Sequence, residues 1–186
     1  MTSIISFEQR KLPSVKIQIL ATIVSVIAAV LLPQFFHWLG IVSGAGKNPG
    51  VAFSPMHPPV MLVGFLAGGY AGGIGGLLAP VVAHFFSGMP NAMQLPFMMI
   101  ELFGYGLGAG LLRNVKFSLI VKVLAVQIFG RLLRMFACIF AFYVLGNEKM
   151  TVLSIWQSIP RALPGILLQL AFIPLIVYWV ENRERK

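Results

Sequence analysis

The sequence predicts an all-α integral membrane protein of six transmembrane helices in a single domain, and its composition and its apolar runs support this prediction. Apolar residues make up 58% of the 186-residue chain and charged residues only 10%. Soluble domains contain about 45–50% apolar and about 25% charged residues. The apolar runs are continuous rather than alternating, which favours membrane helices over a β-barrel. We therefore expect a multi-pass protein of the cell membrane.

The helices are placed by the apolar runs and the turn signals between them. The first run, 17–40, can cross a bilayer of about 30 Å. It is too long for the apolar core of a signal peptide, so we expect it to remain as a helix. A loop rich in Gly, Pro and Ser follows at 41–58, and a break at Gly68 and Gly69 divides the next two short spans. The expected helices are 17–40, 59–69, 70–87, 91–112, 117–145 and 151–180.

Basic residues at the helix flanks predict the orientation. The outer loops hold only Lys47 and Lys149, whereas the flanks on the side of the two termini hold many basic residues. Because basic flanks remain in the cytoplasm, we expect both termini to be cytoplasmic. The same flanks account for most of the formal charge of +9, so we expect a lipid bilayer around the chain and no nucleic-acid partner. The basic residues on the terminal side are Arg10, Lys11, Lys16, Arg113, Lys116, Arg183, Arg185 and Lys186.

Each of the last three predicted helices carries a polar stripe that reaches membrane depth. Glu101, Arg134 and Arg161 lie about ten or eleven residues from the outer helix ends, or about 15 Å at about 1.5 Å per residue. Arg131 lies one turn deeper than Arg134. Each charge at this depth costs roughly 2.5–3.5 kcal/mol on insertion scales, so such residues are seldom present without a function.

The arginines of this layer outnumber its carboxylate, and two interpretations of the surplus are open. In one, Glu101 pairs with one arginine and the others reach polar backbone or water. In the other, a ligand with a carboxylate or phosphate pairs with the remaining arginines. The second accounts better for the surplus, because an unpaired guanidinium carries the full penalty of burial. A guanidinium fork also suits planar anions.

Further candidate ligand contacts share these faces or adjoin them. Gln94 and Tyr105 share the face of Glu101, and Gln157 shares that of Arg161. His57, where the 41–58 loop enters the second helix, is expected to cap the pocket or contact the ligand. We expect no metal and no cofactor, because no Cys, Asp or second loop His accompanies it. The predicted substrate-binding residues are His57, Gln94, Glu101, Tyr105, Arg131, Arg134, Gln157 and Arg161, whereas His37 and His84 are expected to be structural.

Two prolines flank Arg161 in the last predicted helix. Pro160 and Pro164 free backbone carbonyls and kink the helix. Such carbonyls are tolerated at membrane depth only where protein or a cavity satisfies them. The prolines therefore predict a cavity beside Arg161.

Small residues recur at every fourth position in the first half of the chain and again in the fourth helix. This spacing lets helix backbones approach closely in lipid. For the glycines we favour packing within the chain, whereas for the stripe on the first helix we favour docking to a partner. The sequence thus predicts a first half that packs and a second half that binds. The stripes are Ala21, Ser25 and Ala29; Gly64, Gly68, Gly72 and Gly76; and Gly104 and Gly108.

Several short segments of the chain match a known pattern: SPMHPPV at 54–60, GFLAG at 64–68, SGMP at 87–90, LPFMMIE at 95–101 and Tyr105-Gly106. With these segments, and over essentially its whole length, the chain resembles the substrate-binding S-components of energy-coupling factor (ECF) vitamin transporters. The resemblance is to the branch of small S-components for pantothenate, cobalamin or its precursors and similar cofactors.

The resemblance implies a fold of six helices and a way of working. The pocket would lie in the outer half of helices four to six, capped by the loop after helix one. The small-residue face of helix one would dock onto a membrane coupling subunit that is driven by two cytosolic ATPases. The family's Ala-x-x-x-Ala signature is matched imperfectly by Ala21, Ser25 and Ala29.

The leading functional prediction is therefore the substrate-binding subunit of an ECF-type importer for a water-soluble vitamin or vitamin precursor with an anionic group. The chain contains no G-x-x-x-x-G-K-[ST] phosphate loop, so uphill transport would need ATPase partners. The alternative is an autonomous carrier or channel for an organic anion, working as a homo-oligomer. A membrane enzyme acting on lipid is disfavoured, because no paired carboxylate, nucleophile–His set or metal cluster accompanies Glu101.

Overall fold

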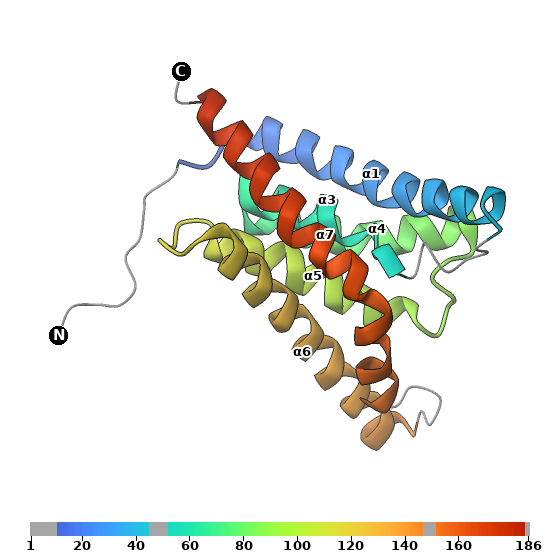
Figure 1. Cartoon of the computed structure of the whole chain (residues 1–186). Helices are drawn as coiled ribbons and strands as arrows, with labels where there is room; N and C mark the ends of the chain where they lie inside the picture. Colours follow the sequence, from blue (N-terminus) through green and yellow to red (C-terminus); the bar gives the residue numbers. More distant parts are fainter. Residues whose placement is uncertain (1–10, 45–51, 147–151, 185–186) are drawn as a thin grey trace.

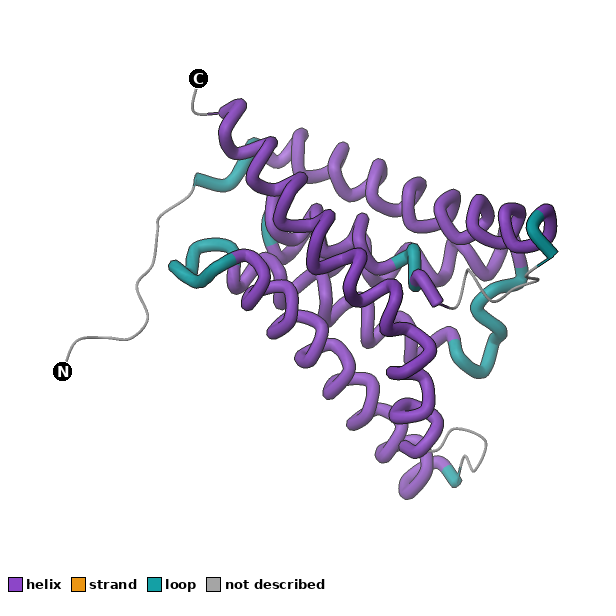
Figure 2. Tube along the Cα trace, in the orientation of Figure 1, coloured by secondary structure: helices purple, strands orange, loops and turns teal. Residues whose placement is uncertain are grey.

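The computed structural model describes residues 11–44, 52–146 and 152–184, with residues 145, 152–159, 161 and 184 described by their backbone alone. These residues form helices joined by loops and turns, and Figure 2 distinguishes the helices from these connections by colour. In the described part, five helices are long and apolar enough to cross a membrane, and a sixth is apolar but shorter. The predicted all-α membrane fold is confirmed. The helices are α1 (Val15–Val42), α3 (His57–Ala67), α4 (Gly69–Ser87), α5 (Leu95–Leu112), α6 (Leu119–Leu145) and α7 (Val152–Glu184).

Local chemistry sets the helix ends. The Oγ atom of Ser118 accepts a hydrogen bond from the backbone N–H of Val121 and caps α6, which ends at Gly146 with a φ of 65°. Helix α5 was expected to begin at residue 91 but begins at Leu95. The backbone N–H of Gln94 donates to the Oδ1 atom of Asn91 at 2.9 Å, which closes a turn instead. Gln94 is therefore the N-cap of α5 rather than part of the helix.

Helix α5 lies at the centre of the bundle. It contacts α3, α4 and α6, while α1 contacts α3 and α4, and α7 contacts α6 and α3. Figure 1 shows α1 and α6 on opposite sides of α5.

Glycine backbones form the contact between α4 and α5. A Cβ added at Gly72 would lie 2.7 Å from the carbonyl oxygen of Gly106, and one at Gly76 would overlap the backbone of Leu102. On the other face of α5, a Cβ at Gly104 would lie 3.0 Å from the Cα of Gly130 in α6. At these three positions, the prediction that the glycines pack within the chain is confirmed.

The small-residue stripe of α1 also packs inward, contrary to the expectation that it meets a partner. Ser25 is 2% exposed and Ala29 is fully buried, and Ala21 on the same face is half-buried. The side chain of Ser25 faces Gly75 of α4. The physical reason is that α4, itself rich in glycine, offers a flat surface against which small side chains pack closely. Larger residues such as Ile23 and Ile27 occupy the exposed face of α1.

Helix α3 spans only part of a bilayer. Its 11 residues rise about 16 Å. Its C-terminal end reaches Gly68, where a φ of 103° breaks the chain before α4 and the side chain of Leu12 lies close by. Its first residue, His57, therefore lies inside the bundle, and the loop before it enters the protein interior to reach it. Irregular backbone at this depth occurs only where protein or a cavity surrounds it.

Basic residues gather at one end of the bundle. Figure 1 shows that the start of α1, the turn between α5 and α6 and the end of α7 lie at this end. Arg113 donates from Nη2 to the carbonyl of Lys11 at 2.9 Å, and Lys122 donates from Nζ to the carbonyl of Arg113 at 3.1 Å. We call this the basic end; it also carries Arg183 of α7.

Two neighbouring glycines of α4 provide a test of this packing. Gly76→Ala places a methyl group against the backbone of Leu102, which cannot move aside as a flexible side chain would. We expect a loss of about 1–3 kcal/mol of stability, measured by thermal unfolding of the detergent-purified chain. The control is Gly75→Ala, whose Cβ would lie 3.4 Å from the Ser25 Oγ atom in ordinary contact. Equal melting temperatures for the two variants would contradict the proposed packing.

Candidate functional site

A cavity of about 240 Å³ lies between α1, α5 and α6, beneath the segments 54–57 and 89–94. It lies away from the basic end, toward the other ends of α1 and α4. Its polar lining residues are Gln34, His37, Ser54, His57, Gln94, Glu101, Arg131 and Arg134, and its apolar ones are Pro33, Pro55, Met56, Ala83, Met89, Pro90, Met98 and Ala162.

The structure brings most of the predicted site residues to this cavity. His57, Gln94, Glu101, Arg131 and Arg134 all line it. Tyr105 does not line it but lies behind Glu101 and is fully buried. The predicted contacts of Gln157 and Arg161 concern side chains that lie outside the described residues. Ala162, next to Arg161, lines the cavity, and Figure 1 shows α7 changing direction in its first half, which holds Pro160 and Pro164.

Glu101 has a partner on each carboxylate oxygen. The Nη1 atom of Arg134 donates to Oε2 at 2.6 Å, and the hydroxyl of Tyr105 donates to Oε1 at 2.8 Å. Glu101 and Tyr105 are one helical turn apart on α5, so the same helix fixes both groups. The sequence left open whether Glu101 pairs with one of the arginines. Arg134 is the arginine that forms this ion pair.

Arg131 leaves a positive charge in the cavity that this pair does not balance. It lines the cavity one turn before Arg134 on α6, and no carboxylate among the described residues forms an ion pair with it. With Glu101 and Arg134 compensating each other, the described lining residues carry one net positive charge. A cavity of this charge favours an anionic guest.

The segment before α3 forms the cap of the cavity. The ring of His57 lies 5.0 Å from that of Tyr105, centroid to centroid, which places the start of α3 against α5. Ser54 adopts a φ of 43°, a left-handed conformation that non-glycine residues seldom adopt outside functional sites and tight turns. Because Ser54, Pro55 and Met56 all line the cavity, this irregular backbone forms part of the site itself.

The same segment is held between α1 and α7. The ring of Phe53 lies 5.1 Å from that of Phe36 in α1, and a Cβ added at Gly165 of α7 would lie 2.5 Å from the carbonyl oxygen of Phe53. The described part of the 41–58 loop thus covers the cavity.

Helix α1 contributes residues that the sequence analysis did not assign to the site. Gln34 and His37 line the cavity, although His37 was expected to be structural and the binding role was assigned to the last three helices. Both halves of the chain therefore line the cavity, whereas the sequence predicts that the first half only packs. A signal was present, since Gln34 and His37 are polar, lie three residues apart and follow Pro33 in an otherwise apolar stretch. By contrast, His84 makes a structural contact, with Nδ1 2.7 Å from the carbonyl oxygen of Pro90.

Gln127 shares the polar stripe of Arg131 and Arg134 but does not reach the cavity. Its Nε2 atom donates to Oε1 of Gln169 in α7 at 2.9 Å, within the buried contact between α6 and α7. Among the described residues, no group of three or more His, Cys, Asp or Glu side chains could hold a metal ion. The chemistry available in the cavity is ion pairing and hydrogen bonding.

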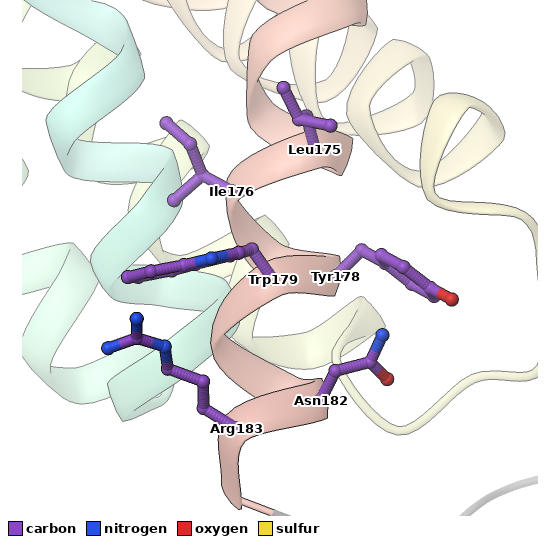
Figure 3. Close-up of a pocket in the computed structure, with 6 residues that line it drawn as sticks. All are labelled: Leu175, Ile176, Tyr178, Trp179, Asn182 and Arg183. Carbon is purple, nitrogen blue, oxygen red and sulfur yellow. The ribbon is translucent and has the colours of Figure 1, made fainter.

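A second hollow, of about 600 Å³ and more open, lies along the C-terminal end of α7 (Figure 3). The guanidinium of Arg183 lies 4.1 Å from the centre of the Trp179 ring, and Trp179 and Tyr178 are more than half exposed. Aromatic residues at the ends of membrane helices anchor them at the lipid surface. The candidate site is therefore the cavity lined by Glu101, Arg131 and Arg134 rather than this hollow. The hollow is lined by Leu175, Ile176, Tyr178, Trp179, Asn182 and Arg183.

The chain matches a known protein family along most of its length. The family model described as "ECF transporter, substrate-specific component" matches residues 10–177. No curated protein and no solved structure matches the chain.

The buried ion pair gives a test of the site's geometry. Glu101→Gln leaves the Arg134 guanidinium without a counter-charge. Arg134→Gln leaves the Glu101 carboxylate without its counter-charge. We expect each to cost about 3 kcal/mol of stability, the lower end for a buried pair because Arg134 is partly exposed. The double variant should be more stable than the sum of the single losses predicts, by at least about 1 kcal/mol. Thermal unfolding of the four proteins measures this coupling, and strictly additive losses would exclude the pair.

Proposed function

The chain belongs to the family of substrate-specific components of ECF transporters, and we propose that it is the high-affinity subunit that captures a water-soluble vitamin or vitamin precursor with an anionic group. The family consists of transporter components rather than enzymes, and membership implies a small-molecule substrate and association with an ECF module. The observation that supports the proposal is the cavity between α1, α5 and α6, in which Arg131 has no carboxylate partner among the described residues. We also propose that, within this family, the chain belongs to the branch that handles pantothenate or cobalamin precursors.

The anionic group of the ligand would bind Arg131. Arg134 is held by Glu101 at 2.6 Å, so its guanidinium is already partly engaged. Arg131 faces the same cavity and has no carboxylate partner among the described residues. A guanidinium can bind a carboxylate through two parallel hydrogen bonds, and these are stronger in a partly buried site than in bulk water. The Glu101–Arg134–Tyr105 cluster would then act as a rigid floor that keeps Arg131 directed to the ligand.

The chain would take up its ligand from outside the cell. The cavity lies away from the basic end, and basic flanks stay in the cytoplasm. This orientation places both termini inside and the cap, with Ser54 and His57, outside. The ligand would enter by displacement of the cap and would be enclosed when Phe53 returns to its place between Phe36 and Gly165.

Delivery inward would depend on partners. The sequence has no phosphate-binding loop of the G-x-x-x-x-G-K-[ST] type, so this chain does not supply the energy itself. We propose that a membrane coupling subunit and two cytosolic ATPases drive the release of the ligand. Because Ser25 and Ala29 are buried against α4, docking of the coupling subunit on α1 would use the exposed face that carries Ile23 and Ile27.

Arg131 is the residue whose loss should affect binding most directly. We expect the wild-type chain, purified in mild detergent, to carry a bound small molecule that native mass spectrometry detects. Arg131→Gln should weaken binding about a hundredfold and lose this molecule, because truncating one member of a buried charge pair costs about 2–5 kcal/mol. The control is Lys116→Gln at the basic end, where the side chain is exposed. Retention of the ligand by folded Arg131→Gln would remove the anion site.

Uptake should require the ECF module. In cells that lack their own vitamin importers, the chain produced with a coupling subunit and two ATPases should accumulate the radiolabelled form of its retained ligand. The chain alone should bind the ligand without accumulating it. Gradient-driven accumulation by the chain alone in liposomes would instead favour an autonomous carrier.

A further inference from the structure

The cavity has a second polar end, formed by α1. Gln34 and His37 are three residues apart and so share one face of the helix, next to Pro33, which also lines the cavity. The Nδ1 atom of His37 is buried and has no hydrogen-bond partner among the described residues. A buried polar atom without a partner is unfavourable unless a ligand or water completes it.

The two polar ends belong to helices on opposite sides of the bundle. Arg131 lies on α6, which contacts α5 and α7, whereas His37 lies on α1, which contacts α3 and α4 (Figure 1). Apolar side chains, among them Met56 and Met98, line the same cavity. A ligand that contacts both Arg131 and His37 therefore needs an anionic group for one and a hydrogen-bonding group for the other, and the cavity also offers it apolar contacts.

The volume of the cavity limits the size of the ligand. Pockets for drug-sized molecules measure about 300–1,000 Å³, and this cavity measures about 240 Å³. The contacts of Phe53 with Phe36 and Gly165 hold the cap in place beside it. A macrocycle such as a corrinoid, or a dinucleotide, is too large for this space. A small carboxylic acid with a few polar atoms fits.

We propose that the substrate is a compact monocarboxylate whose anionic end binds Arg131 and whose neutral hydrogen-bonding end binds His37, so that α1 completes the site. A phosphate ester would bring two negative charges to a cavity whose described residues carry one net positive charge. His37 is thus a specificity-determining residue that selects a hydroxyl, amide or carbonyl at the far end of the ligand. This inference rests on the proposed function and narrows its substrate class.

The ligand class is tested by titrating the purified full-length chain, by calorimetry, with single vitamins of different charge and size. Pantothenate, nicotinate and biotin are compact monocarboxylates, thiamine is a cation, pyridoxine is neutral and cobalamin is a macrocycle. We expect tight binding of one of the monocarboxylates, and at least hundredfold weaker binding of its alcohol or amide counterpart. Tight binding of thiamine, pyridoxine or cobalamin would overturn the inference while leaving vitamin capture intact. Binding of none of them would count against the proposed function as well.

The role of His37 is tested on the vitamin that binds. His37→Leu removes the hydrogen-bonding atom and should weaken binding five- to tenfold, the usual effect of one lost hydrogen bond. His37→Asn places an amide near the position of Nδ1 and should restore binding to within about threefold. Thermal unfolding without ligand checks that both variants fold. If folded His37→Leu binds as tightly as the wild-type chain, or if His37→Asn is as weak as His37→Leu, the ligand does not hydrogen-bond to His37.

Discussion

Neutralisation of charge inside a hydrophobic bundle is the constraint on which the site depends. Glu101 accepts hydrogen bonds from Arg134 and Tyr105 on its two oxygens, so one carboxylate holds a side chain of α6 and a side chain of α5 in fixed positions. The negative charge of the Glu101 carboxylate is thereby balanced by Arg134. Arg131, one turn away, stays in the same enclosed space without an acidic partner among the described residues. An imbalance of this kind, at a depth where a charge costs roughly 2.5–3.5 kcal/mol, is what a site for an exchangeable anion requires.

The packing of the bundle provides the space in which this charge lies. Glycine contacts bring α4 and α5 together at Gly72 and Gly106, which makes one side of the protein dense. Helix α3 is too short to cross the bilayer, so the chain before it enters the interior as irregular backbone and closes the cavity instead of filling it. Helix α5 therefore takes part in both features: one face packs densely against α4, and another carries Glu101, which lines the cavity. The cap packs between Phe36 and Gly165, so any movement of this segment would break contacts with both α1 and α7.

Much of this could be predicted from the sequence, for identifiable reasons. Long apolar runs define membrane helices, and charged residues inside such runs are rare enough to stand out, which is why Glu101, Arg131 and Arg134 were assigned to a common site. Which arginine pairs with Glu101 depends on side-chain geometry that helical periodicity does not contain. His37 was missed because a lone histidine on an apolar helix carries no charge signal. The direction of the Ser25–Ala29 face was missed because a stripe of small residues looks the same whether a neighbouring helix or another protein covers it.

The central claim is that a negatively charged group of the ligand sits on Arg131 within the capped cavity. An experimental structure of the chain with its retained ligand tests this most directly. We predict density for one compact molecule between Arg131 and His37, with its acidic group in contact with the Arg131 guanidinium and the Glu101–Arg134 pair intact beneath it. Ligand density elsewhere, for example in the hollow beside Trp179, or an Arg131 side chain turned away from an empty cavity, would contradict the account.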